Sequence, residues 1–394
     1  MNRMADNILV FCNQPLPISE TFVYHQIAGL RRYHAIVLGV KKPKGPSIDL
    51  SGLDVHLISH GGIRGTVREF GLKMFGYVPQ SVRQLLCRLR PKLVHAHFAP
   101  YGAIALPIAQ FGGLPLLVSV HGTDVTMSDA AIWRSSYFAH RLYLLRRRTL
   151  VHTTSRVIVQ SNFLKRIVIE RHGFRPDQVV CIRYGIDTDQ FHPRPEATKW
   201  GNILYVGRLV ERKGLPFLLY ALALLQERFS DLHLTVIGDG PMRKQYEVLA
   251  RHLLGQRVTF LGAQPTIVVR HYLEQAYIFC MPSITMPSGE SETLGVVFLE
   301  AMAMQVPPVS FHSGGIPEVI IHGQTGFLAR ERQTEELAHY IDLLLTNRPL
   351  RDRMGFQGRQ WVEQEFNLVK QNAKLEALYD EVIAESSCYR QSEL

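Results

Sequence analysis

The chain has 394 residues, 46% of them apolar and 20% charged, a composition that predicts a soluble globular protein of two domains and excludes intrinsic disorder. The net charge of +10 is uneven, because residues 1–193 carry 24 Lys and Arg against 11 Asp and Glu, whereas residues 194–394 carry 20 against 23. Unless this charge serves only solubility, the first half attracts an anionic partner such as nucleic acid, a phosphorylated acceptor or an anionic membrane surface.

The sequence shows no pattern of export or of membrane insertion. Its five cysteines are widely spaced, without the pairing typical of a disulfide framework or a zinc site, and indicate reduced thiols. The apolar run Ile8–Cys12 is too short for a signal peptide, and proline and glycine interrupt the longest apolar region, Ala103–Val120. We therefore expect a cytoplasmic protein, with any membrane contact peripheral.

Short apolar, β-branched runs alternate with longer helical patterns along the whole chain. The predicted strands are Asn7–Phe11, Ala35–Gly39, Leu93–Ala96, Leu116–Ser119, Val157–Val159, Val179–Ile182, Asn202–Val206, His233–Ile237, Val258–Leu261, Ile278–Met281 and Pro308–Phe311. Buried strands separated by helices predict parallel sheets in doubly wound α/β domains, which bind ligands at the carboxyl ends of their strands.

A domain boundary is predicted near Phe191–Pro195, where two prolines in three residues stiffen the backbone and exclude helix. The predicted domains are residues 1–193 and 194–368. The amphipathic stretch Val369–Glu385 follows the second strand–helix series, and we expect residues 369–394 to form a helix that crosses back onto the first domain.

The segment after the first predicted strand, Pro15–Phe22, has polar residues suited to a helix start. Ser19 is a plausible N-cap and Glu20 lies in the favourable first turn, which explains both residues structurally. Because the segment lies at a carboxyl strand end, where a ligand would bind, Ser19, Glu20 and Thr21 are also candidates for contact with an acceptor substrate.

His121-Gly122-Thr123-Asp124 follows the predicted strand Leu116–Ser119, again at a carboxyl end. His121 could donate a hydrogen bond to a phosphate or sugar oxygen across an interdomain cleft. Asp124 is a further candidate for contact with an acceptor substrate. A structural histidine that caps a turn is the alternative.

A basic loop follows the strand Asn202–Val206. Gly207 frees the backbone where a ligand would approach, and Arg208 and Lys213 offer a fork of donors and a point charge suited to a diphosphate. A solvated basic loop is the alternative.

Gly238-Asp239-Gly240 resembles part of a dinucleotide fingerprint. Arg243 stands where the third glycine would be, and the strand is not in the first βα unit, so NAD binding is disfavoured. A tight turn beside a nucleotide pocket is the better interpretation.

Two carboxylates, Glu292 and Glu300, are separated by seven residues. Glu300 lies inside an apolar helix predicted to begin near Gly295, where a carboxylate is unfavourable unless something binds it. Ribose hydroxyls suit Glu300, and the helix start offers free N–H groups to phosphate oxygens. A buried salt bridge of Glu300 is the alternative.

Together these residues resemble the retaining glycosyltransferases of family 4, which have the GT-B fold of two Rossmann-like domains facing across a cleft. The resemblance covers nearly the whole chain and is densest in PSGESETLGVVFLEAMAMQVPPVSFHSGGIPEVIIHGQTGFL. The segment Ser19–Phe22 resembles the transferases of exopolysaccharide and colanic-acid biosynthesis. Two departures are Pro15–Thr21 in place of a glycine-rich loop, and Thr293-Leu294-Gly295 in place of Gly-Phe-Gly.

The resemblance implies roles for the motif residues. Arg208 and Lys213 would hold the diphosphate, Glu300 the ribose and Glu292 the hydroxyls of the transferred sugar. His121 would lie near that sugar. The remaining donor contacts would come from Gly207, Gly238 and Asp239 and from the backbone around Leu294, Gly295 and Val296.

We therefore expect a retaining transfer of a hexosyl group from a nucleotide sugar, such as a UDP- or GDP-sugar, to a glycan or polyprenyl-diphosphate-linked acceptor, without metal or other cofactor. A GT-B-fold sugar-nucleotide epimerase is the alternative enzyme. Nucleic-acid binding is disfavoured because no known signature is present. Arg64–Lys92 and Arg146–Arg148 are candidates for contact with an anionic leaflet, with solvated helix faces as the alternative.

Overall fold

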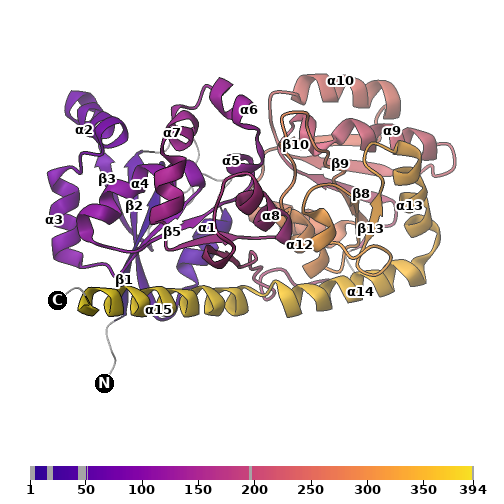
Figure 1. Cartoon of the computed structure of the whole chain (residues 1–394). Coiled ribbons are helices and arrows are strands. Elements are labelled where there is room, and N and C mark those ends of the chain that lie inside the picture. The colour runs from indigo at the N-terminus through magenta and orange to yellow at the C-terminus, as the bar shows by residue number, and fades with distance from the viewer. Residues whose placement is uncertain (1–4, 16–20, 43–49, 51, 195–197, 393–394) are drawn as a thin grey trace. The chain divides into compact units, whose positions relative to one another are not determined.

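The computed structural model describes residues 5–15, 21–42, 50, 52–194 and 198–392 (Figure 1). The chain divides into two compact units, Met1–Gly185 with Leu368–Leu394, and Ile186–Asn367. Each unit is built on one parallel sheet flanked by helices, which confirms the predicted pair of doubly wound Rossmann-like domains.

The sheet of the first unit has its described strands in the order β3-β2-β1-β4-β5-β6-β7, all parallel. These strands are β1 (Asp6–Cys12), β2 (Tyr33–Lys41), β3 (Asp54–Ser59), β4 (Val94–His97), β5 (Leu116–Ser119), β6 (Arg156–Val159) and β7 (Val179–Cys181). The helices of the unit are α1 (Thr21–Ala28), α2 (Gly62–Phe75), α3 (Gln80–Leu89), α4 (Ala99–Gly112), α5 (Thr123–Thr126), α6 (Asp129–Arg134), α7 (Phe138–Thr153), α8 (Asn162–Glu170) and α15 (Leu368–Ser392).

Both faces of this sheet are buried. Successive side chains of a strand point to opposite faces, and in β1 Leu9 and Phe11 join one apolar cluster while Ile8 and Val10 join another. A strand covered on both faces has a continuous apolar sequence, which is why β1 is recognisable in the chain.

Helix α15, yellow in Figure 1, covers one of these faces. Its buried side chains, Leu375, Leu378, Tyr379 and Val382, share the cluster of Ile8 and Val10. Polar contacts fix its position: Glu376 Oε1 accepts the backbone N–H groups of Arg31 and Arg32 at 2.7 Å, and Arg156 donates to Glu381 and Glu385 at 2.6 Å. The predicted return of the C-terminal helix to the first domain is thereby confirmed.

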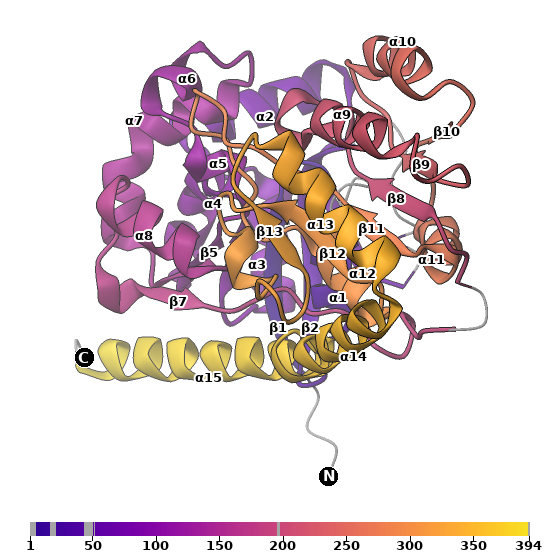
Figure 2. The ribbon, with the colours of Figure 1, turned by 90° about the vertical axis from the view of Figure 1, so that its right-hand side faces the viewer.

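The sheet of the second unit has its described strands in the parallel order β10-β9-β8-β11-β12-β13. These strands are β8 (Asn202–Val206), β9 (His233–Ile237), β10 (Val258–Gly262), β11 (Ile278–Cys280), β12 (Pro308–Phe311) and β13 (Phe327–Ala329). The helices are α9 (Leu215–Leu225), α10 (Arg243–Leu254), α11 (Thr266–Gln275), α12 (Val296–Ala303), α13 (Thr334–Thr346) and α14 (Arg348–Glu365). Figure 2 shows α9 and α13 side by side over this sheet.

Two strands were not predicted from the sequence, β3 and β13. Each lies at the edge of its sheet. Strand β3, DVHLIS, is only partly buried over its first four residues, and β13 has only three residues. Edge strands need less apolar surface than central ones, so their sequences carry a weaker pattern.

The division between the units lies after Gly185, eight residues before the predicted boundary at 193, and the chain returns to the first unit at Leu368. Arg359 of α14 explains the earlier division, because its guanidinium donates to the carbonyl oxygens of Thr188 and Phe191 at 3.3 and 3.0 Å. These bonds attach the segment before the prolines to the second unit.

Candidate functional site

The second unit has a natural place for a ligand between β8 and β11. The chain order of strands reverses there, because β9 and β10 lie on one side of β8 and β11 to β13 on the other. Open α/β sheets bind ligands at the carboxyl ends of the strands at such a point. Arg208 and Lys213 follow β8, and Glu292 and Glu300 follow β11.

The loop after β8 is held by the turn after β9. Gly238 has a φ of 143°, and a Cβ on it would lie 2.0 Å from the carbonyl oxygen of Gly207, so only glycine permits this approach. The N–H of Leu209 donates to the carbonyl of Asp239 at 2.9 Å. The two predicted donor-site glycines, Gly207 and Gly238, thus form one packed unit at the carboxyl edge.

The carboxylate of Asp239 is used within its own turn. One oxygen accepts the N–H of Gly240 at 2.7 Å, and the other accepts from the Arg243 guanidinium at 3.1 Å. Arg243, which stands in place of the third fingerprint glycine, is therefore the ion-pair partner of Asp239. A donor contact by the Asp239 side chain stays a prediction.

Lys213 and Glu292 lie in direct contact. Gly214, at the start of α9, has a φ of 68° and packs so closely that a Cβ would lie 1.8 Å from the carbonyl oxygen of Pro282. This packing joins the segment after β8 to the segment after β11. Lys213 Nζ pairs with Glu292 Oε2, and both side chains are about nine-tenths buried.

A second cation, Arg212, completes this cluster. Its guanidinium nitrogen lies 3.5 Å from the same Glu292 oxygen. Burial alone would raise the pKa of Glu292, but the charges of Lys213 and Arg212 outweigh it and hold the pKa below its ordinary value. The sequence analysis missed Arg212, although its position beside Lys213 in a basic loop was a usable signal.

The Gly314-Gly315 turn supports this cluster from behind. A Cβ on Gly314, whose φ is 56°, would lie 2.1 Å from the Glu292 carbonyl oxygen, and the N–H of Gly315 donates to that oxygen at 2.8 Å. Leu294 is fully buried in the same loop. The backbone around Glu292 is therefore held in place.

Arg208 is not part of the cluster. Its side chain is exposed, and it forms no ion pair with any residue that the structure describes. The structure therefore brings Lys213 and Glu292 together and leaves the guanidinium of Arg208 free in solvent.

Glu300 is a half-buried carboxylate without an ion-pair partner in the described chain. The alternative of a buried salt bridge is thus not observed. Burial raises the pKa of Glu300 to about 7. Helix α12, which carries it, begins after Gly295 with φ 78° and has no side-chain cap, so the first N–H groups, including that of Val296, are available to a ligand.

The predicted histidine of the first unit has partners on both ring nitrogens. His121, which follows β5, has Nδ1 2.7 Å from the Tyr184 hydroxyl and Nε2 3.1 Å from His97 Nδ1. Burial lowers the pKa of His121 to about 3 and that of His97 well below its usual value, so both rings are neutral. Donation by His121 to a substrate would require one of these contacts to open.

Asp124 serves the turn that carries His121. Its buried carboxylate accepts the N–H groups of Ala99, His121 and Gly122 at 2.9, 3.0 and 2.7 Å. These bonds give the Asp124 carboxylate a structural role in the turn, and the predicted contact of Asp124 with an acceptor stays a prediction.

The predicted N-terminal contact residues are only partly described. Ser19 and Glu20 lie outside the described residues, and Thr21 is the first residue of α1. The next residue, Phe22, packs its ring 5.0 Å from that of His121 and 4.7 Å from that of Tyr184. The start of α1 therefore lies beside the histidine.

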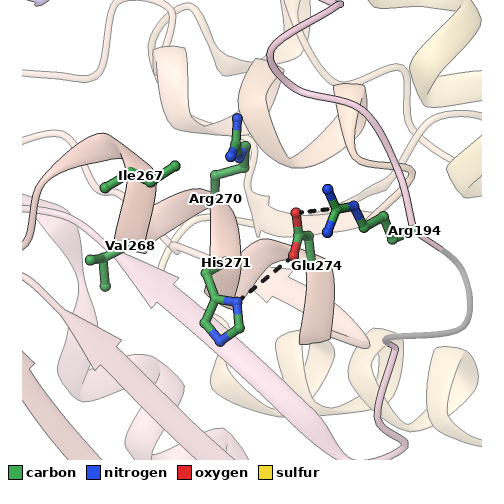
Figure 3. A pocket seen from close by; sticks show the side chains of 6 residues that line it. All are labelled: Arg194, Ile267, Val268, Arg270, His271 and Glu274. Carbon is green, nitrogen blue, oxygen red and sulfur yellow. Dashed lines mark ion pairs between the residues drawn. The ribbon is translucent and has the colours of Figure 1, made fainter.

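A cavity of about 360 Å³ lies elsewhere in the second unit, beside α11 (Figure 3). The Glu274 carboxylate lies between two basic side chains, with Oε1 3.7 Å from Arg194 Nε and Oε2 3.8 Å from His271 Nδ1. The other residues that line the cavity are Ile267, Val268 and Arg270. Since no predicted site residue lines it, this cavity is distinct from the cluster of Lys213, Arg212 and Glu292.

Comparison with known families matches both units. Residues 187–361 match the family described as Glycosyl transferases group 1, and residues 19–190 match the one described as Glycosyltransferase Family 4. The two matched segments meet close to the division seen in the structure.

Two relatives illustrate the range of similar proteins. The GDP-mannose-dependent alpha-(1-6)-phosphatidylinositol monomannoside mannosyltransferase of Mycobacterium tuberculosis is 30% identical over 292 residues, 70% of this chain and 72% of the relative. The putative colanic acid biosynthesis glycosyltransferase WcaL of Escherichia coli is 28% identical over 290 residues, 71% of this chain and 69% of the relative.

Solved structures share the fold. Anabaena Alr3699/HepE in complex with UDP superposes with a TM-score of 0.74 at 20% identity, covering 96% of this chain and all of the other. A glycosyltransferase from Rickettsia africae superposes with a TM-score of 0.76 at 18% identity, covering 97% and 99%. Nothing in these comparisons supports a sugar-nucleotide epimerase.

Proposed function

The chain belongs to the group 1, family 4 glycosyltransferases, and from this premise we propose that it moves a hexosyl group from a nucleoside-diphosphate sugar to a glycan or lipid-linked oligosaccharide, with retention of anomeric configuration. The setting we propose is the synthesis of an exopolysaccharide or another cell-surface polysaccharide. The names of relatives in colanic acid and amylovoran biosynthesis support this setting.

The observation that carries the donor assignment is the carboxylate of Glu300 on the uncapped helix α12, which has no ion-pair partner among the residues that the structure describes. A half-buried carboxylate whose pKa is raised by burial is unfavourable in its ionised form and gains from a hydroxyl donor. Ribose hydroxyls can donate hydrogen bonds to this carboxylate, and phosphate oxygens can accept hydrogen bonds from the N–H groups at the start of α12. One nucleoside diphosphate would satisfy both.

The Lys213–Glu292 contact suggests how the site changes when the donor binds. In the structure Glu292 is an ion-pair partner of Lys213. We propose that the diphosphate replaces Glu292 as the partner of Lys213, which releases the carboxylate for the hydroxyls of the sugar. Arg208, exposed and unpaired among the described residues, would join Lys213 on the diphosphate.

Cleavage of the anomeric C–O bond places negative charge on the departing diphosphate. In this proposal Lys213, Arg208 and the α12 N-terminus stabilise that charge, so the reaction proceeds without a metal ion. Lowering the barrier by about 3 kcal/mol through one such cation corresponds to roughly a hundredfold in rate. His121 is proposed to lie near the transferred sugar, after exchange of one of its present contacts.

The relatives give the candidate substrates to test. One relative is named for GDP-mannose and phosphatidylinositol monomannoside, and structures of Alr3699/HepE contain UDP or UDP-glucose. A lipid-linked acceptor, such as a sugar on a polyprenyl diphosphate, would also place the enzyme at a membrane surface and give the basic first half a partner.

The test is to incubate the full chain with UDP- and GDP-hexoses, with and without lipid-linked glycan acceptors, and to measure release of the nucleoside diphosphate. Transfer requires both substrates, whereas an epimerase would convert the donor alone. NMR of the anomeric proton in the product reads retention directly, and an inverted product would reject that part of the proposal. No turnover with any donor, together with no thermal stabilisation by UDP or GDP, would reject the whole assignment.

A further inference from the structure

Helix α2 (Gly62–Phe75) has a second apolar face that the fold does not cover. Its inner face is well anchored: Leu72 is fully buried, and Gly65 lies so close to β3 that a Cβ would be 2.5 Å from Ser59 Oγ. At its end the Arg146 guanidinium donates to the carbonyl of Met74 at 3.3 Å. The orientation of the helix on the first unit is therefore fixed.

The opposite face carries a continuous row of large apolar side chains. Ile63, Val67, Phe70 and Met74 follow one another at spacings of four, three and four residues, which places them on one side of a helix. Their exposed fractions are 85%, 63%, 56% and 42%. Phe75, at the end of the helix, is 78% exposed. Soluble proteins rarely leave such a row open to water without a partner.

The charge next to this row is positive. Arg64 and Arg68 are exposed on α2 and form no ion pair within the described chain. The anionic side chain of the helix, Glu69, faces inward and is paired with Lys73 and Lys41. Together with the excess of cations in residues 1–193, this makes the surface of α2 apolar and basic.

The other predicted basic stretch does not have this character. Arg146 is engaged with the carbonyls of Ala103 and Met74, and Arg147 forms a two-pronged pair with Asp129 at 2.8 Å. Only Arg148 of the three is left exposed. Of the two stretches predicted from the sequence, the structure therefore favours the one that contains α2.

We propose that α2 lies flat on an anionic lipid bilayer, with Ile63, Val67, Phe70 and Met74 among the acyl chains and Arg64 and Arg68 at the lipid phosphates. An apolar row flanked by arginine is the pattern of helices that bind in the plane of a membrane. Within the described chain no helix is both long and apolar enough to cross a bilayer. This surface acts independently of the transfer reaction, and it would bring the enzyme to a lipid-linked acceptor.

The test is flotation of the full chain with vesicles of phosphatidylcholine alone and of phosphatidylcholine with phosphatidylglycerol. We expect the protein to float only with the anionic vesicles and to be released by salt. Phe70→Glu should weaken this binding about tenfold, because it buries a charge in place of an aromatic ring. Arg64→Gln and Arg68→Gln should each weaken it about fivefold, and only on anionic vesicles.

Val248→Glu is the matched control. Val248 is a 70% exposed apolar residue on α10 of the second unit, and the same substitution there should leave flotation unchanged. Thermal unfolding and stabilisation by UDP or GDP establish that each variant is folded, and they separate a failure of the membrane surface from a failure of the donor site.

Three results would overturn the proposal. The parent protein could ignore anionic vesicles, or Phe70→Glu could float as well as the control. Light scattering could also show a dimer that Phe70→Glu dissociates, in which case a second copy of the chain is what covers α2.

Discussion

Replacing Glu300 by glutamine should make the protein more stable and a poorer binder of nucleotide. The carboxylate is half-buried, has no ion-pair partner among the described residues, and has its pKa raised from 4.5 to about 7 by burial. Each pKa unit corresponds to about 1.4 kcal/mol, so the ionised side chain destabilises the folded state by at most about 3.5 kcal/mol. Water that reaches the exposed part of the carboxylate reduces this figure.

The sign of the effect follows from proton binding. The folded state holds the Glu300 proton more tightly than the unfolded state, so stability falls as pH rises from about 4.5 to about 7 and is level above that range. Glutamine keeps the shape without the charge. We expect Glu300→Gln to be about 1–2 kcal/mol more stable than the parent at pH 8, with little difference near pH 4.5.

Binding should move in the opposite direction. A hydrogen bond between a carboxylate and a ribose hydroxyl contributes about 1.5–3 kcal/mol, and a neutral amide retains only part of it. Affinity for UDP or GDP, whichever the parent binds, should therefore fall about tenfold or more.

Urea unfolding at the two pH values and isothermal titration with nucleotide measure the two effects. Glu227→Gln is the control, because Glu227 is an exposed glutamate of the same unit, and its substitution should alter neither quantity. The reasoning fails if Glu300→Gln is less stable than the parent at pH 8, or if it binds nucleotide with unchanged affinity.

Three other outcomes follow from the structure. Arg208→Ala and Lys213→Ala should each lower kcat roughly a hundredfold, and full turnover in either variant would remove that residue from the reaction. Only Lys213→Ala should also lower the free energy of unfolding measured without nucleotide, because it leaves Glu292 buried with Arg212 as its remaining cation. Leu375→Ala should lower the free energy of unfolding by about 2–5 kcal/mol, since this fully buried side chain of α15 packs on the first sheet, and a loss below 1 kcal/mol in urea unfolding would contradict the packing described. Chelation by EDTA should leave the initial rate of transfer unchanged, and a rate restored only by added Mg²⁺ or Mn²⁺ would show that the cations of the chain are insufficient.

The central strands of both sheets were predictable because burial on two faces gives their sequences a continuous apolar pattern. Strand β8 (Asn202–Val206) and β12 (Pro308–Phe311) were predicted with their observed bounds. The edge strands β3 and β13 were not predictable in this way, since one is only partly buried and the other very short. The helix start at Gly295 was also predicted, because an apolar run followed a glycine.

Contacts between distant segments could not be read from the sequence. The pairing of Lys213 with Glu292 depends on how closely Gly214 approaches the carbonyl of Pro282, a fit between two loops that only the folded backbone defines. The same holds for Asp124, whose three backbone partners come from two different strand ends. A polar residue at a strand end looks the same in sequence whether it serves a ligand or a turn.

The two glutamates of the E-x7-E pattern show what the fold adds. The sequence already places Glu300 inside an apolar helix and Glu292 in the loop before it. The structure adds two cations beside Glu292 and, among the residues it describes, none paired with Glu300. One pKa is consequently held below its ordinary value and the other is raised to about 7, although both side chains follow the same strand. Groups whose environments separate their pKa values in this way are suited to different tasks. In the proposed mechanism Glu292 is an exchangeable anion for Lys213, whereas Glu300 is a carboxyl that gains from any hydroxyl reaching it. This difference would orient a nucleotide sugar with its ribose toward α12.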